Sequence, residues 1–110
     1  MEGLMPTVYT LGKGKQFEYE GSVEVGLTLF FGDKRTRHCI DAQTLSSLLT
    51  HFRHRQVPVA VGSSHDRPPP GSLGEWLIEN HSKTQISRYV APILVSEGYA
   101  AVSGEKLAFL

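Results

Sequence analysis

The stretch Ser72–Gly98, SLGEWLIENHSKTQISRYVAPILVSEG, contains two similar helix-start patterns that lie ten residues apart. In the first pattern Ser72 is followed three residues later by Glu75, and in the second Ser82 is followed three residues later by Gln85. In a capping box the serine oxygen accepts a hydrogen bond from the amide of the third helical residue, whose side chain reaches back to the serine amide. The spacing therefore predicts two short helices joined by a turn.

Apolar periodicity supports both helices. Leu73, Trp76 and Leu77 share one face of the first helix, as expected for a helix that packs on a core. The second helix is predicted over Lys83–Ser96, and its buried stripe is formed by Ile86, Tyr89, Val90, Ile93 and Leu94. Two amphipathic helices at this spacing are typical of a helix-turn-helix pair.

Gly98 and Pro92 indicate where the second helix ends and whether it stays straight. Glycine readily takes the left-handed conformation that ends many helices, so Gly98 predicts the stop after Glu97. Pro92 lies opposite the apolar stripe on a helical wheel and removes one backbone hydrogen bond. We expect Pro92 either to bend the helix around the core or to break it.

The first 40 residues alternate between apolar and polar positions, which predicts an antiparallel meander. Val23 to Phe31 is the clearest strand, because every second residue is apolar over nine positions. The other strands are predicted over Thr7–Leu11, Gln16–Tyr19 and Thr36–Ile40, with turns at Gly12–Lys15, Glu20–Ser22 and Gly32–Lys34.

Asp41 is a favourable N-cap for a helix from Ala42 to about Arg55. A short strand, Val57–Val61, follows that helix, and a hairpin formed by Tyr99–Val102 and Lys106–Leu110 follows the helix pair. The chain is thus predicted to be a single α+β domain over residues 1–110. Its halves are a meander at 1–40 and a helix, strand, helix, helix and hairpin at 41–110.

Composition limits the possible function classes. The 110 residues contain 11 Lys and Arg and 11 Asp and Glu, so the formal charge is zero. The composition therefore does not indicate the strongly basic surface that is typical of nucleic-acid-binding proteins. Cys39 is the only cysteine, which excludes an internal disulfide and fits a cytoplasmic protein. We expect no signal peptide and no membrane partner, because neither a leader pattern nor a long apolar run is present.

From Asp41 onward the predicted order of elements resembles a winged-helix DNA-binding domain. The resemblance implies that the helix over Lys83–Ser96 enters the major groove and that the turn at Ser103–Glu105 forms the wing. The residues expected to contact DNA are Lys83, Thr84, Gln85, Ser87 and Arg88.

Each of these side chains has a suitable chemistry. Arg88 can pair with guanine and Gln85 with adenine, whereas Lys83 and Ser87 suit phosphate oxygens. From Ser72 onward the chain has three Lys and Arg against four Asp and Glu, a local charge of minus one. Phosphate contacts supply most non-specific affinity, so we expect a homodimer to offset weak binding by each monomer.

Two alternatives to DNA binding remain open. The protein is also interpretable as a non-catalytic interaction or self-assembly module, which would use an exposed sheet edge or the face that carries Phe30. The loop Ser63–Arg67 precedes three stiff prolines, and Ser64, His65 and Arg67 could bind an anion or small ligand there. No catalytic residue is assigned, and an enzyme is the least favoured class.

The remaining reactive side chains have ordinary structural interpretations. His51 and His54 lie at i and i+3, but the sequence supplies no clear third ligand, so neither a metal nor a cofactor is expected. Cys39 is expected to be a small buried thiol. Trp76 is expected to anchor the core rather than to offer a stacking surface.

Overall fold

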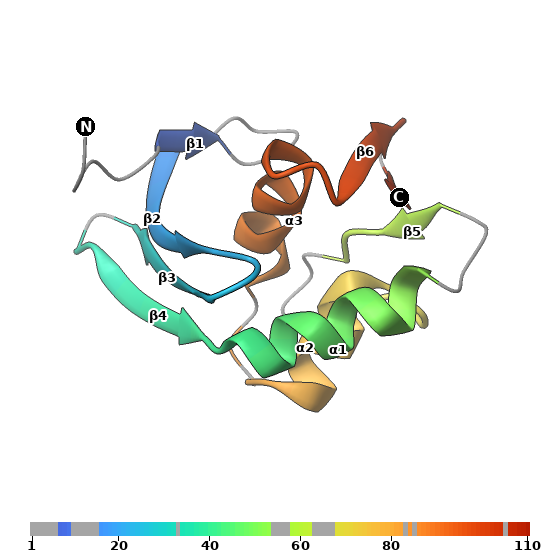
Figure 1. Ribbon diagram of the computed structural model, residues 1–110, viewed down its shortest axis with the longest axis horizontal. Coiled ribbons are helices and arrows are strands. Elements are labelled where there is room, and N and C mark those ends of the chain that lie inside the picture. The colour runs from blue at the N-terminus through green and yellow to red at the C-terminus, as the bar shows by residue number, and fades with distance from the viewer. Residues whose placement is uncertain are drawn as a thin grey trace.

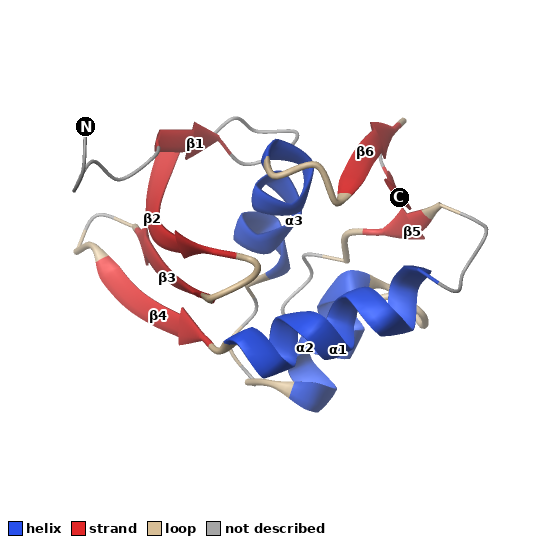
Figure 2. Ribbon diagram, viewed as in Figure 1, coloured by secondary structure: helices blue, strands red, loops and turns tan. Residues whose placement is uncertain are grey.

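The computed structural model describes residues 7–9, 16–32, 34–53, 58–62, 68–82, 84, 86–104 and 106–110 of the chain. Within these residues the fold is α+β, with a four-stranded sheet, three helices and a three-stranded sheet (Figures 1 and 2). The elements are β1 (Thr7–Tyr9), β2 (Gln16–Ser22), β3 (Gly26–Phe31), β4 (Thr36–Ile40), α1 (Ala42–Arg53), β5 (Val59–Ala60), α2 (Leu73–Asn80), α3 (Ser87–Ser96), β6 (Ala100–Ser103) and β7 (Lys106–Phe109).

The predicted N-terminal meander is confirmed. Its four strands are antiparallel and lie in the order β1-β2-β3-β4, so that β1 and β4 are the edges. Successive side chains of a strand point to opposite faces of its sheet. One face of this sheet is therefore buried through Phe17, Tyr19, Leu27, Leu29 and Ile40.

The connection between β2 and β3 differs from the prediction. Glu20 to Ser22 were expected to form a turn, but β2 continues to Ser22, which pairs with Gly26. The turn is formed by Val23–Val25 instead. Alternating valines resemble a strand, but the chain reverses over Val23–Val25. Gly26, the first residue of β3, has a φ of 111°, which glycine adopts readily because it has no Cβ.

Helix α1 begins where the sequence predicted. The amide of Thr44 donates a hydrogen bond of 2.8 Å to Oδ1 of Asp41, which confirms Asp41 as the N-cap. The helix is described to Arg53, and residues 54–57 lie outside the described residues. Its predicted apolar stripe is buried and consists of Leu45, Leu48, Leu49 and Phe52.

Helix α2 confirms the first of the two predicted caps. The amide of Glu75 donates to Oγ of Ser72 at 3.1 Å. The return bond reaches one residue further back than in a standard capping box, because Oε1 of Glu75 accepts the amide of Gly71 at 2.8 Å. Ser72 is almost fully buried at this helix start.

The second predicted cap is wrong. Helix α3 begins at Ser87 and not at Lys83, and its N-cap, Ile86, makes no side-chain capping bond. Oγ of Ser82 accepts the amide of Thr84 at 3.2 Å, which forms a local turn before the helix. Serine side chains bond nearby amides in turns as well as at helix starts, so the spacing alone did not distinguish the two.

The end of α3 is as predicted. Gly98 has a φ of 85°, its amide bonds the carbonyl of Val95, and the amide of Tyr99 bonds the carbonyl of Leu94. These two bonds form a Schellman motif. Pro92 is inside the continuous helix, so the helix does not break there. Pro92 is also buried, which shows that the side opposite the predicted stripe is covered too.

The C-terminal hairpin is confirmed and belongs to a second sheet. Strand β7 lies between β5 and β6, and both pairings are antiparallel. The predicted order from residue 41 is therefore confirmed as α1, β5, α2, α3, β6 and β7. Gly62, which follows β5, lies against the start of α2, and a Cβ on Gly62 would come within 2.3 Å of Oγ of Ser72.

Helix α3 occupies the centre of the molecule, between the meander and the C-terminal sheet (Figure 1). The ring of Tyr89 stacks on Phe31 at 4.2 Å between centroids and meets the edge of Phe17 at 5.1 Å. Beyond the helix end, Glu97 accepts one hydrogen bond from the hydroxyl of Tyr19 and another from the amide of Val23, each 2.9 Å long. The meander therefore contacts α3 near its start, through Tyr89, and just beyond its end, through Glu97.

Candidate functional site

The two residues of α3 that were predicted to contact DNA, Ser87 and Arg88, differ in exposure. Ser87 is 0% exposed, and its hydroxyl donates to the carbonyl of Gly62 at 3.3 Å. Ser87 was expected to contact DNA, but its side chain is not accessible to a partner in this structure. Arg88 is partly exposed and Thr84 is exposed. Lys83 and Gln85 lie outside the described residues.

This burial bears directly on the expected recognition helix. A helix that reads the major groove must present a free face to the base edges. Within α3 only Ser96 is exposed, and the helix lies between two sheets. The physical reason is composition. Ala91, Pro92 and Val95 lie outside the main stripe of α3, so more than one side of the helix is apolar and packs against its neighbours.

The anion-binding alternative falls outside the described part of the chain. Ser64, His65 and Arg67 belong to residues 63–67, which the structure does not describe. Their candidate role stays a prediction from the sequence.

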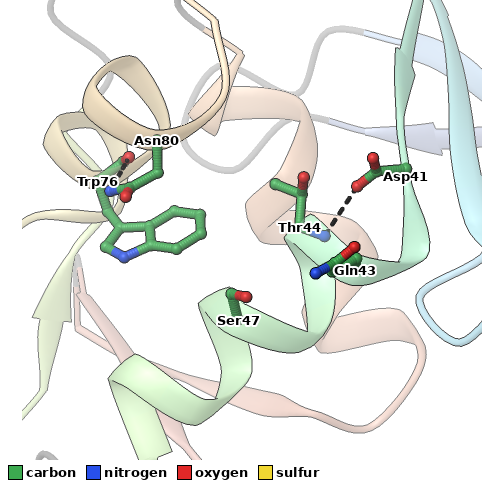
Figure 3. A pocket seen from close by; sticks show the side chains of 6 residues that line it. All are labelled: Asp41, Gln43, Thr44, Ser47, Trp76 and Asn80. Atoms are coloured by element: carbon green, nitrogen blue, oxygen red, sulfur yellow. Dashed lines mark hydrogen bonds between the residues drawn. The ribbon is translucent and has the colours of Figure 1, made fainter.

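The structure instead shows cavities around Trp76, between α1 and α2. One cavity of about 230 Å³ lies near the start of α1 (Figure 3). The indole of Trp76 reaches from α2 toward Thr44 and Ser47 on α1 (Figure 3). The cavity is lined by Asp41, Gln43, Thr44, Ser47, Trp76 and Asn80.

A second cavity of about 320 Å³ extends toward the start of α2 and the end of α1, and it shares Trp76 and Asn80 with the first. We call the pair the Trp76 cavities. The second cavity is lined by His51, Gly71, Ser72, Glu75, Trp76, Glu79 and Asn80.

Local hydrogen bonds fix several of these side chains. Hydrogen bonds from Thr44 lower the pKa of Asp41, so its carboxylate is ionised at neutral pH. Glu75 is held by the amide of Gly71, and Nδ2 of Asn80 donates to the carbonyl of Trp76 at 2.9 Å. Bonds at the helix starts therefore hold Asp41 and Glu75, and a bond within α2 holds Asn80.

Trp76 is half-buried and forms the shared wall. Its ring lies 6.5 Å from that of the buried Phe52 and 6.2 Å from that of His51, measured between centroids. The prediction that Trp76 anchors the core therefore describes only part of the residue. The rest of its surface lines the cavities.

The described lining residues of the Trp76 cavities include three carboxylates and one histidine, His51. The carboxylates are those of Asp41, Glu75 and Glu79, and the described lining residues include neither lysine nor arginine. Glu75 and Glu79 are one helical turn apart, and like charges at i and i+4 destabilise a helix by about 0.2–0.5 kcal/mol. That repulsion is relieved when a cation binds between them.

The other surface considered from the sequence is less open than expected. The guanidinium of Arg35 lies 5.2 Å from the centroid of the Phe30 ring and forms an ion pair with Glu18. Phe30 is consequently half-covered rather than a free apolar patch. Cys39 is exposed, so its prediction as a buried thiol is wrong, and its sulfur lies 3.7 Å from Oγ1 of Thr28.

Sequence reasoning did not find the Trp76 cavities because they need two helices to be juxtaposed. The available signal was the pair Glu75 and Glu79 on either side of Trp76, together with a polar side of α1 that carries Gln43 and Ser47. Each part alone is an ordinary solvated helix face. Only the packing of α1 against α2 brings the two polar faces to one tryptophan.

No protein-family model matches this chain, and no curated protein or solved structure matches it either. None of the helices described is long and apolar enough to cross a membrane. Among the described residues, no group of three or more His, Cys, Asp or Glu side chains could hold a metal ion.

Proposed function

We propose that this protein is a non-catalytic interaction module of the cytoplasm, which binds a lysine- or arginine-containing segment of a partner protein at the Trp76 cavities. The observation that carries the proposal is the concentration of three carboxylates around a half-buried indole. Opposite charge is the chemistry that complements such a surface.

The aromatic wall adds a contact that favours a cation over other ligands. A lysine ammonium or arginine guanidinium over a tryptophan face gains about 0.5–1 kcal/mol at an exposed site. The hydroxyl of Ser47 and the amides of Gln43 and Asn80 supply donors and acceptors for a peptide backbone. The cavities therefore offer both charge recognition and hydrogen bonding.

Size favours side chains over a large cofactor. The two volumes, about 230 and 320 Å³, lie at or below the lower end of the range of about 300–1,000 Å³ for small-molecule pockets. Each cavity can accept one long basic side chain. A segment with two basic residues can occupy both at once.

Trp76 also reports binding, because it is the only tryptophan in the chain. Titration with a short arginine- and lysine-rich peptide should change its fluorescence at low salt. A peptide of the same length with glutamate at the basic positions should have no effect. Salt should weaken the response, since the Debye length falls from about 10 Å at 0.1 M to about 3 Å at 1 M.

Two variants and a control locate the binding site, with fluorescence anisotropy of the labelled peptide as the measurement. Glu79→Gln should weaken binding about two- to fivefold, the effect of losing one exposed ion pair. Trp76→Leu should weaken binding by a similar factor, because the cation–aromatic contact is lost. Glu24→Gln, in the exposed turn between β2 and β3, should leave binding unchanged. Equal affinity for the native and Glu79→Gln proteins would contradict the proposal.

DNA binding and homodimer formation, both expected from the sequence, are tested with the same material. Duplex DNA replaces the peptide in the low-salt titration, and light scattering after size exclusion gives the mass. If the protein binds DNA but not the basic peptide, DNA binding by the helix-turn-helix pair replaces peptide binding at the Trp76 cavities as the proposed function.

A further inference from the structure

A histidine pair, which neighbours the Trp76 cavities but does not line them, joins the two halves of the molecule. Nε2 of His38, on β4, lies 3.0 Å from Nε2 of His81, the C-cap residue of α2. The ring centroids are 5.1 Å apart and the planes are inclined at 75°, so the rings meet by their nitrogen-bearing edges. Both side chains are half-buried.

The separation of the two nitrogens suits a shared metal ion. Imidazole nitrogens bind zinc at about 2.0–2.1 Å, and two nitrogens 3.0 Å apart would subtend an angle of about 91–97° at an ion at that distance from both. This is the angle between neighbouring ligands in octahedral or tetragonal coordination. Imidazole suits nickel, copper and zinc, and tetragonal sites with nitrogen and oxygen ligands favour Ni²⁺ and Cu²⁺.

The surroundings fit an open site rather than a closed one. No group of three potential ligand side chains occurs in the part of the chain that the structure describes, so two protein nitrogens would be completed by water. Half-burial of the rings leaves water access to the remaining positions. The nearby carboxylate of Asp41 interacts electrostatically with His81 and partly offsets the charge of a cation there.

We propose that His38 and His81 form a binding site for a divalent transition-metal ion, Ni²⁺ or Cu²⁺. Binding replaces the present contact between the two nitrogens, and each ring turns so that its lone pair points at the ion instead of at the other imidazole. The ion links β4 to the end of α2, two elements whose ligands are 43 residues apart in the sequence. Because the folded state alone brings these nitrogens together, the ion stabilises it.

The test uses the full chain without a histidine tag, freed of metal by chelation, and NiCl₂ as the probe. Calorimetry should show one ion bound per chain. At a free-ion concentration of about 100 times Kd, the ratio of folded to unfolded protein should rise about 100-fold. A higher Tm should accompany this change.

His38→Ala and His81→Ala should each abolish the metal-dependent rise in Tm, whereas His51→Ala, an exposed histidine on α1, should retain it. Chemical modification tests the native chain itself. Ni²⁺ should protect His38 and His81, but not His51, from diethyl pyrocarbonate, as mapped by mass spectrometry. Absence of binding, or binding lost only in His51→Ala, would show that the pair is simply a hydrogen bond between imidazoles.

Discussion

Helices α2 and α3 come from similar sequence patterns but occupy opposite environments. Helix α2 starts at a serine cap and keeps one side open, where Glu79 and Asn80 are exposed. Helix α3 starts without a side-chain cap and is enclosed between two sheets. The comparison shows that apolar periodicity can indicate a helix, whereas the elements that pack around it decide which faces remain available to a partner.

The largest expected effect concerns the enclosed helix. Ser87→Lys should destabilise the fold by about 3–5 kcal/mol, because it places an unpaired charge where Ser87 is fully buried. Ser96→Lys, on the exposed end of the same helix, should change stability by no more than about 0.5 kcal/mol. Urea denaturation measures both variants. If Ser87→Lys did not change the free energy of unfolding, the start of α3 would have to be accessible to solvent.

A second effect concerns the hydrogen bonds that join the meander to Glu97, just beyond the end of α3. Glu97→Ala should cost about 1–3 kcal/mol, since the hydroxyl of Tyr19 and the amide of Val23 lose their acceptor. Glu20→Ala, on the exposed face of β2, is the matched control. Urea denaturation should show a clear loss of stability only for the first variant.

The same contact predicts a loss of stability at alkaline pH. Burial, followed by the hydrogen bond to Glu97, raises the pKa of Tyr19 to about 12. An unfolded tyrosine ionises near 10, so between about pH 10 and 12 the unfolded chain gives up a proton that the folded chain keeps. The stabilisation is complete below pH 10 and is lost as the pH rises toward 12. Tyr19→Phe has no hydroxyl to ionise, so its free energy of unfolding should fall less between pH 9 and pH 11 than that of the native protein.

The smallest expected effect separates the two serines that share one sequence pattern. Ser72→Ala should cost about 1 kcal/mol, the usual contribution of an N-cap. Ser82→Ala should cost less than about 0.5 kcal/mol, because Ser82 bonds only the turn amide of Thr84. Thermal unfolding of the two variants compares them directly. Equal losses would indicate that Ser82 also caps a helix.

Much of the fold could be predicted because its signals are local. The Asp41 cap, the apolar stripe of α1 and the glycine stop at Gly98 depend on contacts within one or two helical turns. The errors have local causes as well. Valines in the β2–β3 turn resembled a strand, and the serine before α3 resembled a cap because serine bonds nearby amides in both settings.

The candidate site was much less predictable. Trp76 was correctly placed on the core side of α2, but its exposed edge and the facing residues of α1 depend on how two helices cross. His38 and His81 come together only when β4 meets the end of α2. Neither spacing in the sequence nor residue type indicates such pairs, since side chains distant along the chain carry no periodic signal.

Sequence alone determined where most helices and strands form, their order and the α+β class, because backbone hydrogen bonding and apolar periodicity act over a few residues. The tertiary structure decided which surfaces are exposed. It enclosed α3 between two sheets, opened the cavities beside Trp76 and joined His38 to His81. The physical reason is that burial depends on what each face packs against, and those partners are supplied by distant parts of the chain.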